Sequence, residues 1–398
     1  MNSSPTSSSS EMPSPSMFSV DDMLADIRDL VSIESPSRDI AQLTQHALRI
    51  SQLMEQHLGS APTLIDSPVG PHIHWRGGES PRTLILGHHD TVHPIGTLQQ
   101  FPFAVVGDKA TGPGIFDMKT GIVQAIHAVG ALRRVAPELL GGIEILLTAD
   151  EEIGSHASRA LLEERAKAAG STLVLEPSAD GGALKTGRKG TGTFTIEVHG
   201  RASHAGLEPE KGINALTELA ALLPQIVALA DSDHGTTVTP TLANAGTADN
   251  VVPALATCAV DVRVQNMSEK TRIETALSSL RCVHPEARVE VRGAITRPPM
   301  HSSASTELMK IASDVAYDIG VGEIQGVEVG GGSDGNFTAA CGVQTLDGLG
   351  AVGAGAHTLS EYVVVSTLPT RAALIAGMCY RLCSIDKMPP LSSVPAER

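Results

Sequence analysis

Three consecutive acids follow an apolar segment of the chain. The segment is Ile143–Thr148, and Asp150, Glu151 and Glu152 begin two residues after its end. A short apolar segment of this kind predicts a buried strand, and burying an ionised carboxylate is costly unless it is paired or binds a metal ion. A pair of glutamates alone is more often part of a solvated loop. Here it indicates a site, because four further positions of metal-ligand type follow the same pattern.

The candidate metal ligands are imidazoles and carboxylates without a thiolate: His88, Asp117, Glu152, Glu176 and His357. This ligand set is typical of catalytic rather than structural zinc. Five protein ligands are too many for one open tetrahedral ion, but they suit two ions if one carboxylate bridges them. Paired ions of this kind lie roughly 3.5–4 Å apart and hold the attacking oxygen between them. We expect Asp117 to be the bridge, since backbone N–H groups can hold a short carboxylate at a helix start.

Two further acids complete the predicted chemistry. Asp90 lies two residues after His88 and can accept its second ring N–H, which would fix the tautomer. Glu151, which binds neither ion in this scheme, can take a proton from water and pass it to a leaving nitrogen. His89 and His93 are interpreted as structural histidines and not as ligands.

Length and composition favour a two-domain α/β enzyme. The 398 residues exceed the usual size of a single core. A net charge of −15 argues against a nucleic-acid partner, whose phosphates need a basic face. No apolar run has the length of a membrane span, and five scattered cysteines without a Cys-x-x-Cys motif argue against a disulfide framework, so we expect a cytoplasmic protein without a membrane partner. Residues 1–17 are rich in Ser and Pro and lack the features of a signal peptide, which predicts a disordered leader.

The predicted elements place the candidate ligands at strand ends. Apolar strands are predicted at 83–87, Ile143–Thr148 and 172–175. Helices are predicted at about 119–135 and at 155–169, the second capped by Ser155. Alternating strands and helices predict a mostly parallel sheet, in which ligands bind beyond the carboxyl ends of the strands.

A different pattern occupies residues 188–298. Alternating strands at 193–198, 257–264 and 288–292, with helices at about 212–230 and 269–280, predict a small inserted α/β sandwich. The alternation leaves one sheet face exposed or against a partner, so we expect the insert to form the dimer surface. The first pattern then resumes, with helices at 303–319 and Leu368–Ser384. The predicted organisation is a leader (1–17), a catalytic domain in two parts (18–187 and 299–398), and a dimerisation or lid domain (188–298).

The spaced motifs resemble those of the co-catalytic zinc aminoacylase and carboxypeptidase family. They are His88-x-Asp90-Thr91-Val92, Gly112-Pro113-Gly114-Ile115-x-Asp117-x-Lys119, Asp150-Glu151-Glu152 and Glu176-Pro177. The family includes glutamate carboxypeptidase, acetylornithine deacetylase and succinyl-diaminopimelate desuccinylase. The likeness is greatest to the bacterial glutamate carboxypeptidases that cleave folates, the carboxypeptidase G group. It covers nearly the whole chain after the leader. One departure is Thr120, which replaces a usual glycine and should affect packing more than metal binding.

The resemblance implies a metallopeptidase fold with two Zn²⁺ ions per subunit, for which Co²⁺ or Mn²⁺ could substitute. His88 and Glu176 would hold one ion, Glu152 and His357 the other, and Asp117 both. His204, in Ser203-His204-Ala205-Gly206, would reach the active site of the partner subunit in a homodimer and stabilise the oxyanion. Three residues would line the pocket for the substrate's α-carboxylate: Asn250, Arg263 and Arg297. Gly332 and Ser333, in a glycine loop near that pocket, would also bind the substrate. An arginine fork suits a planar carboxylate.

The expected activity is hydrolysis of an amide bond next to a free carboxylate. Release of a C-terminal glutamate from a peptidyl or folyl substrate is the leading hypothesis. A deacylase acting on N-acyl amino acids, of the acetylornithine or succinyl-diaminopimelate type, shares the metal site and remains an alternative. A non-catalytic metal-binding homologue would be marked by loss of the base or a ligand, and none is lost.

Overall fold

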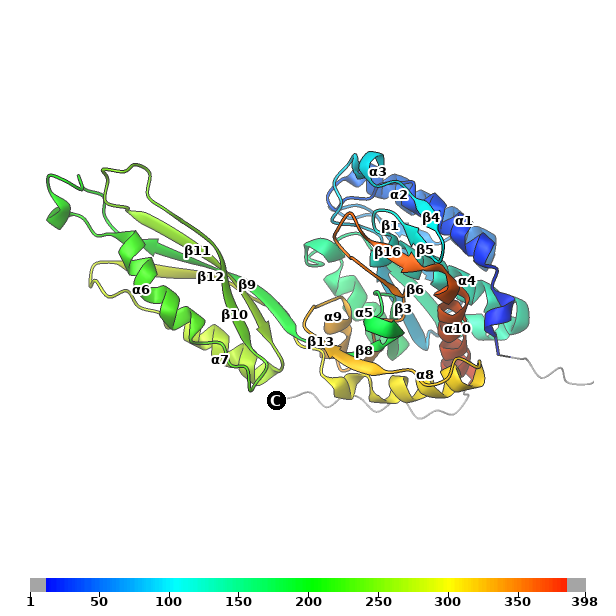
Figure 1. Ribbon diagram of the computed structural model, residues 1–398. Helices are drawn as coiled ribbons and strands as arrows, with labels where there is room; N and C mark the ends of the chain where they lie inside the picture. Colours follow the sequence, from blue (N-terminus) through cyan, green and yellow to red (C-terminus); the bar gives the residue numbers. More distant parts are fainter. Residues whose placement is uncertain (1–11, 385–398) are drawn as a thin grey trace, which may run out of the picture. The chain divides into compact units, whose positions relative to one another are not determined.

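The structure is a computed structural model and describes residues 12–384. A six-stranded sheet lies at the centre of the larger unit of the chain (Figure 1). The strands run in the order β1 (Thr63–Ile65), β2 (His72–Arg76), β6 (Ile143–Thr148), β3 (Thr83–His88), β7 (Ser171–Val174) and β14 (Gln344–Leu346). Strands β6, β3, β7 and β14 are parallel, and β1 and β2 add an antiparallel pair at one edge. The prediction of a mostly parallel sheet is confirmed.

The central strands are buried on both faces. Ile85 of β3 belongs to a core with five helices, whereas Leu84 and Leu86 face a second core with two. Burial on both sides explains why these strands are continuous apolar runs. The helices of the first core are α1 (Val20–Val31), α2 (Ile40–Leu58), α4 (Thr120–Val135), α8 (Thr306–Asp318) and α10 (Leu368–Ser384), and those of the second are α5 (Arg159–Ala169) and α9 (Gly335–Ala340).

A small sheet, not predicted from the sequence, joins two segments that are distant in the chain. It runs in the order β15 (Gly353–Ala354), β16 (Tyr362–Val364), β5 (Lys109–Thr111) and β4 (Ala104–Val106). Six residues of the segment 101–112 pair in strands β4 and β5. Tyr362 pairs antiparallel with Thr111. The segment after β5, which carries Asp117, therefore lies beside the segment before β16, which carries His357.

The second unit comprises Arg188–His301 and Val329–Gly332 among the described residues. Its antiparallel sheet has the order β10 (Thr237–Ala245), β11 (Leu255–Val264), β9 (Gly190–His199) and β12 (Arg288–Arg297). Helices α6 (Ala215–Val227) and α7 (Met267–Ser278) pack on the face formed by the alternate apolar residues of β9 and β11. The opposite face carries polar side chains that solvent reaches. The segment Val329–Gly332, predicted as part of the catalytic domain, packs with this unit.

Two further local predictions are wrong. Residues 1–11 of the expected leader lie outside the described residues, but 12–17 are ordered: Pro15–Met17 forms a 3-10 turn, and Met12 and Met17 pack on the main core. These methionines supply apolar surface in a segment that is otherwise Ser/Pro-rich.

Within the described residues, no helix has the length and apolar character needed to span a membrane.

The second error concerns the start of α5. Ser155 does not cap this helix; its hydroxyl donates to Asp334 instead. The Asp150 carboxylate accepts the N–H of Ala157 at 2.7 Å and of Ser158 at 3.3 Å. The first of the three consecutive acids therefore has a structural role, and it fixes the chain on which Glu151 and Glu152 stand.

Candidate metal centre

Three of the predicted ligands come from neighbouring parallel strands at one edge of the main sheet. His88 is the last residue of β3 and pairs in register with Thr148, the last residue of β6. Glu152 follows Thr148 by four residues, and Glu176 follows the end of β7 by two. Parallel strands carry their chains to the same edge, so these side chains converge.

The five predicted ligands form two groups that share Asp117. Oδ1 of Asp117 is 3.2 Å from Nε2 of His88, and Oε1 of Glu176 is 3.6 Å from the same nitrogen. Oδ2 of Asp117 is 3.3 Å from Nε2 of His357, which also lies 3.3 Å from Oε2 of Glu152. Within each group the ligand atoms lie within 4.8 Å of one another. A tetrahedral zinc ion with bonds of about 2.0–2.2 Å separates its ligand atoms by about 3.3 Å. The residues therefore fit two ions, with one Asp117 oxygen for each.

The carboxylates of this site stabilise positive charge on the two histidines. The carboxylates of Asp117 and Glu152 accept hydrogen bonds from His357 and raise the pKa of this histidine to about 10. Burial would lower the pKa of His88, but the carboxylates of Asp117, Asp90 and Glu176 outweigh it and raise that pKa well above its ordinary value. Burial likewise opposes ionisation of Asp117, yet the two histidines hold its pKa well below the usual range. Divalent cations would supply the same positive charge.

Asp90 connects His88 to Glu151 and Glu152 but, contrary to expectation, its carboxylate is not the main hydrogen-bond partner of His88. The nearest acceptor for Nδ1 of His88 is the main-chain carbonyl of Asp90 at 3.0 Å, and the expected carboxylate contact is longer, at 3.4 Å. The carboxylate mainly accepts the N–H groups of Glu151 at 3.2 Å and Glu152 at 3.3 Å, and the hydroxyl of Ser37 at 2.7 Å. Asp90 thus holds the segment that carries the predicted base.

The other two histidines near His88 have protein partners, as expected of structural residues. Nε2 of His89 lies 2.9 Å from the carbonyl oxygen of Pro71. Nε2 of His93 lies 2.9 Å from Glu361. Thr120 is fully buried, and its hydroxyl has no hydrogen-bond partner among residues 12–384, so it acts through packing.

Glu361 was not among the residues expected from the sequence. Its side chain is fully buried. One carboxylate oxygen accepts the N–H groups of Phe116 at 2.7 Å and Asp117 at 2.9 Å, and the other accepts that of Gly114 at 3.0 Å as well as the His93 ring. Asp117 is thus held through its main chain by another carboxylate, and not, as expected, through its own carboxylate. The sequence feature that could have indicated Glu361 is its position directly before strand β16, in the segment that follows His357.

Replacing Glu361 with glutamine should weaken metal binding and activity about 10–100-fold, the range for residues that orient metal ligands. One acceptor oxygen would become an N–H₂ group facing N–H donors, and the 114–117 loop would loosen. Zinc affinity by chelator competition, with kcat/KM, measures this effect. Glu144→Gln is the matched control, because Glu144 is equally buried but lies near the opposite end of β6. Equal losses in both variants would show that the effect is not specific to the ligand loop.

Three of the predicted substrate-binding residues lie near one another on the second unit. Arg263 and Arg297 both pair in register with Thr191, one from each side, so their side chains share a sheet face. A Cβ atom on Gly332 would lie 3.0 Å from Thr191 and 3.4 Å from Arg297, so the glycine loop lies against these two residues. The Arg263 guanidinium makes two hydrogen bonds of 2.9 Å to Asp261.

The remaining predicted residues differ in exposure. His204 is exposed, and its Nδ1 accepts the N–H groups of Gly206 and Leu207 at 3.1 Å each, which leaves the proton of a neutral ring on Nε2. Asn250 lies beside it, and its main-chain carbonyl oxygen accepts the N–H of Ala205 at 2.9 Å. Ser333 has no exposed surface, and its hydroxyl donates to Asp347 at 2.6 Å. Its side chain therefore stabilises the loop before α9, which does not fit the predicted contact with substrate.

Comparisons with known proteins identify the family of the chain. The model of the peptidase family M20/M25/M40 matches residues 84–381. Carboxypeptidase G2 of Pseudomonas sp. (strain RS-16) is 35% identical over 328 residues, 80% of this chain and 78% of its own length. Succinyl-diaminopimelate desuccinylase of Dechloromonas aromatica (strain RCB) is 30% identical over 325 residues, 75% of this chain and 83% of its own length.

The fold also matches a solved structure. The aminopeptidase PepT of Bacillus cereus ATCC 10987 superposes with a TM-score of 0.74 at 21% identity, covering 92% of this chain and 99% of that one. With the family model matching most of the chain, the sequence and the fold lead to one assignment: this hydrolase belongs to the peptidase family M20/M25/M40.

Proposed function

We propose that the protein is a two-zinc carboxypeptidase that hydrolyses the amide bond next to a free carboxylate and releases C-terminal glutamate from peptidyl or folyl substrates. The proposal rests mainly on the two ligand groups that share Asp117. Glu151 precedes Glu152, a ligand of the second group, in the sequence. Similarity to carboxypeptidase G2 supports the glutamate preference.

Two bound zinc ions would supply an acidified water and a polarised substrate carbonyl. Glu151 is 8% exposed, and its main-chain N–H donates to Asp90. Its carboxylate would take the proton from water and deliver it to the leaving nitrogen. The Nε2–H group of His204 would donate to the carbonyl oxygen as negative charge develops.

Recognition of the free carboxylate would fall to Arg297, with Gly332 beside it and Arg263 on the other side of Thr191. Arg297 is 8% exposed, and a partly desolvated guanidinium binds a carboxylate more strongly than an exposed one. The Arg263 side chain is 35% exposed and pairs with Asp261, so the more buried Arg297 is the better candidate for the direct contact.

Replacing Arg297 with alanine should raise KM for a glutamate-terminated substrate about 10–100-fold. This is the loss in binding expected when a hydrogen bond to a charged group is removed. Steady-state kinetics with the free acid and with its α-amide measure this, and the variant should lose the preference between them. Arg288→Ala is the matched control on the same strand, because Arg288 is largely exposed and pairs with Glu290. If wild-type protein cleaved acid and amide equally, carboxylate recognition would be disproved.

The desuccinylase relative favours one alternative, hydrolysis of an N-acyl amino acid on the same metal centre. A panel of peptidyl-glutamate, folyl-glutamate, N-acetylornithine and N-succinyl-diaminopimelate separates the two functions. We expect kcat/KM to be highest for the two glutamate substrates. A higher value for either acylated amine would assign the deacylase function instead.

We further propose a homodimer in which His204 acts in the active site of the partner subunit. The exposed position of His204 on the second unit and the solvent-accessible polar face of its sheet support this assembly.

A further inference from the structure

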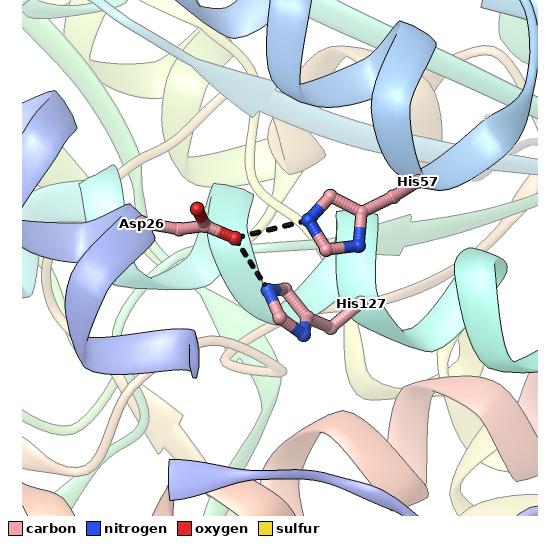
Figure 2. A group of neighbouring side chains, drawn as sticks. All are labelled: Asp26, His57 and His127. Carbon is pink, nitrogen blue, oxygen red and sulfur yellow. Dashed lines mark hydrogen bonds and ion pairs between the residues drawn. The ribbon is translucent and has the colours of Figure 1, made fainter. Parts of the chain in front are cut away.

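Three side chains outside the catalytic group converge where α1, α2 and α4 meet (Figure 2). Asp26 comes from α1, His57 from the last turn of α2, and His127 from α4. Oδ2 of Asp26 lies 3.0 Å from Nε2 of His57 and 2.7 Å from Nε2 of His127. The two ring centroids are 4.4 Å apart, and the three potential ligand atoms lie within 4.8 Å of one another.

The packing of α2 on α4 brings these residues together. Gly130 lies on α4 three residues after His127, and a Cβ atom there would be 3.3 Å from both Cβ and the carbonyl oxygen of His57. The glycine thus lets the end of α2 approach the turn that carries His127. Arg133, one turn further along α4, donates to the carbonyl oxygen of His57 at 3.4 Å. His127 is seven residues beyond Thr120, about 10 Å along the helix by its rise, which separates this cluster from the Asp117 loop.

We propose that Asp26, His57 and His127 bind a third transition-metal ion, with Zn²⁺ the best match and water at the fourth position. Two imidazoles and one carboxylate form a ligand set for zinc, and also for the nickel, copper and cobalt ions that prefer nitrogen. The side chains are 14%, 17% and 9% exposed for Asp26, His57 and His127, so a water molecule can reach the open position.

The charges around Asp26 favour a cation. Among residues 12–384, its carboxylate pairs with the two histidines and with no arginine or lysine. A comparable group on the second unit, Glu197, His199 and Glu290, differs in this respect. There the glutamates already have cationic partners, with Arg292 3.0 Å from Glu290 and 3.9 Å from Glu197. A divalent ion bound there would have to displace the arginine from the two glutamates. At Asp26 the ion would displace only the Nε2 protons of His57 and His127.

The geometry requires a small expansion. The two nitrogen–oxygen distances are 3.0 and 2.7 Å, and a tetrahedral zinc ion needs about 3.3 Å, so the side chains must separate by roughly 0.3–0.6 Å. Each imidazole must also carry its proton on Nδ1. In the described part of the chain neither Nδ1 has a protein hydrogen-bond partner, so each is available to hold it. Without an ion, the same atoms form a hydrogen-bonded clamp between three helices.

Zinc stoichiometry of the full-length protein tests the proposal. Protein stripped with a chelator is titrated with ZnCl₂, and bound metal is measured by elemental analysis after desalting. We expect one zinc fewer per chain in both Asp26→Asn and His57→Gln than in the wild type. His234→Gln should match the wild type, because His234 pairs with Asp231 at 2.8 Å without a second histidine. Added zinc should also raise the Tm of the wild type more than that of either variant.

The outcomes are separable from those of the catalytic centre. If the catalytic pair did not bind zinc, the wild type would hold one ion and the variants none, which would retain this proposal and reject the proposed function. Equal zinc content in the wild type and in His57→Gln would overturn the proposal, and so would equal content in a folded Asp26→Asn. A zinc-independent loss of Tm in the variants would then identify the cluster as a hydrogen-bonded clamp.

Discussion

Replacing Glu151 with glutamine should lower kcat about 10²–10⁴-fold while the protein keeps its metal ions, the effect of losing a general base. The amide has the shape of the carboxylate but cannot accept a proton at neutral pH. Glu151 belongs to neither ligand group, and its N–H donates to Asp90 whichever side chain it carries. The fold of the acidic segment and the occupancy of the site should therefore survive.

The neighbouring residue provides the matched control. Glu152 lies 3.3 Å from Nε2 of His357 in the second ligand group, so Glu152→Gln should lose activity together with metal. Turnover and zinc content are measured on the same samples of both variants. A Glu151→Gln protein that turns over at the wild-type rate with full zinc content would remove Glu151 from the mechanism.

The parts of the site that were predictable follow uninterrupted buried strands. His88, Glu152 and Glu176 stand at or just beyond β3, β6 and β7, whose apolar runs reveal both the strand and its end. The parallel sheet then brings the three ends together without further information. The same reasoning located Leu368–Ser384 with its observed bounds, because a long apolar helix leaves a strong pattern in the sequence.

What could not be predicted depends on pairing between distant segments. Strands β4, β5 and β16 have three residues each, too few for a periodic pattern, and Tyr362 pairs with Thr111 across some 250 residues. The role of Glu361 follows from that pairing, since its partners are main-chain N–H groups of the 114–117 loop. Strand β10 was missed because most of its residues are exposed and so carry no apolar alternation.

Buried and partly buried carboxylates have two roles in this protein. Those of Asp117, Glu152 and Glu176 face histidines across the site, whereas those of Asp90, Asp150 and Glu361 accept main-chain N–H groups of the segments that carry the ligands. The second set stabilises loops that would otherwise leave donors unsatisfied. An acid in such a loop is therefore weak evidence for metal binding until its acceptor geometry is known.

Replacing His204 with alanine should lower kcat about 10²–10³-fold, the effect of losing one oxyanion donor, with zinc content unchanged. His204→Gln is the conservative variant, because its amide retains an N–H donor, and it should keep more activity. These kinetics, with zinc analysis on the same protein, separate the loss of a donor from damage to the metal centre. A His204→Ala protein with normal kcat would exclude the oxyanion role.

Mixing two inactive variants then tests whether His204 acts across subunits. In dimers formed at random from His204→Ala and Glu151→Gln chains, half are mixed, and each mixed dimer has one site with both groups intact. Activity should therefore return to about a quarter of the wild-type value. Glu152→Gln mixed with Glu151→Gln is the control, because both changes lie in the same unit and no intact site can form. If the His204→Ala mixture also stayed inactive although exchange of subunits was verified, His204 would serve its own chain, and the dimeric site proposed here would be wrong.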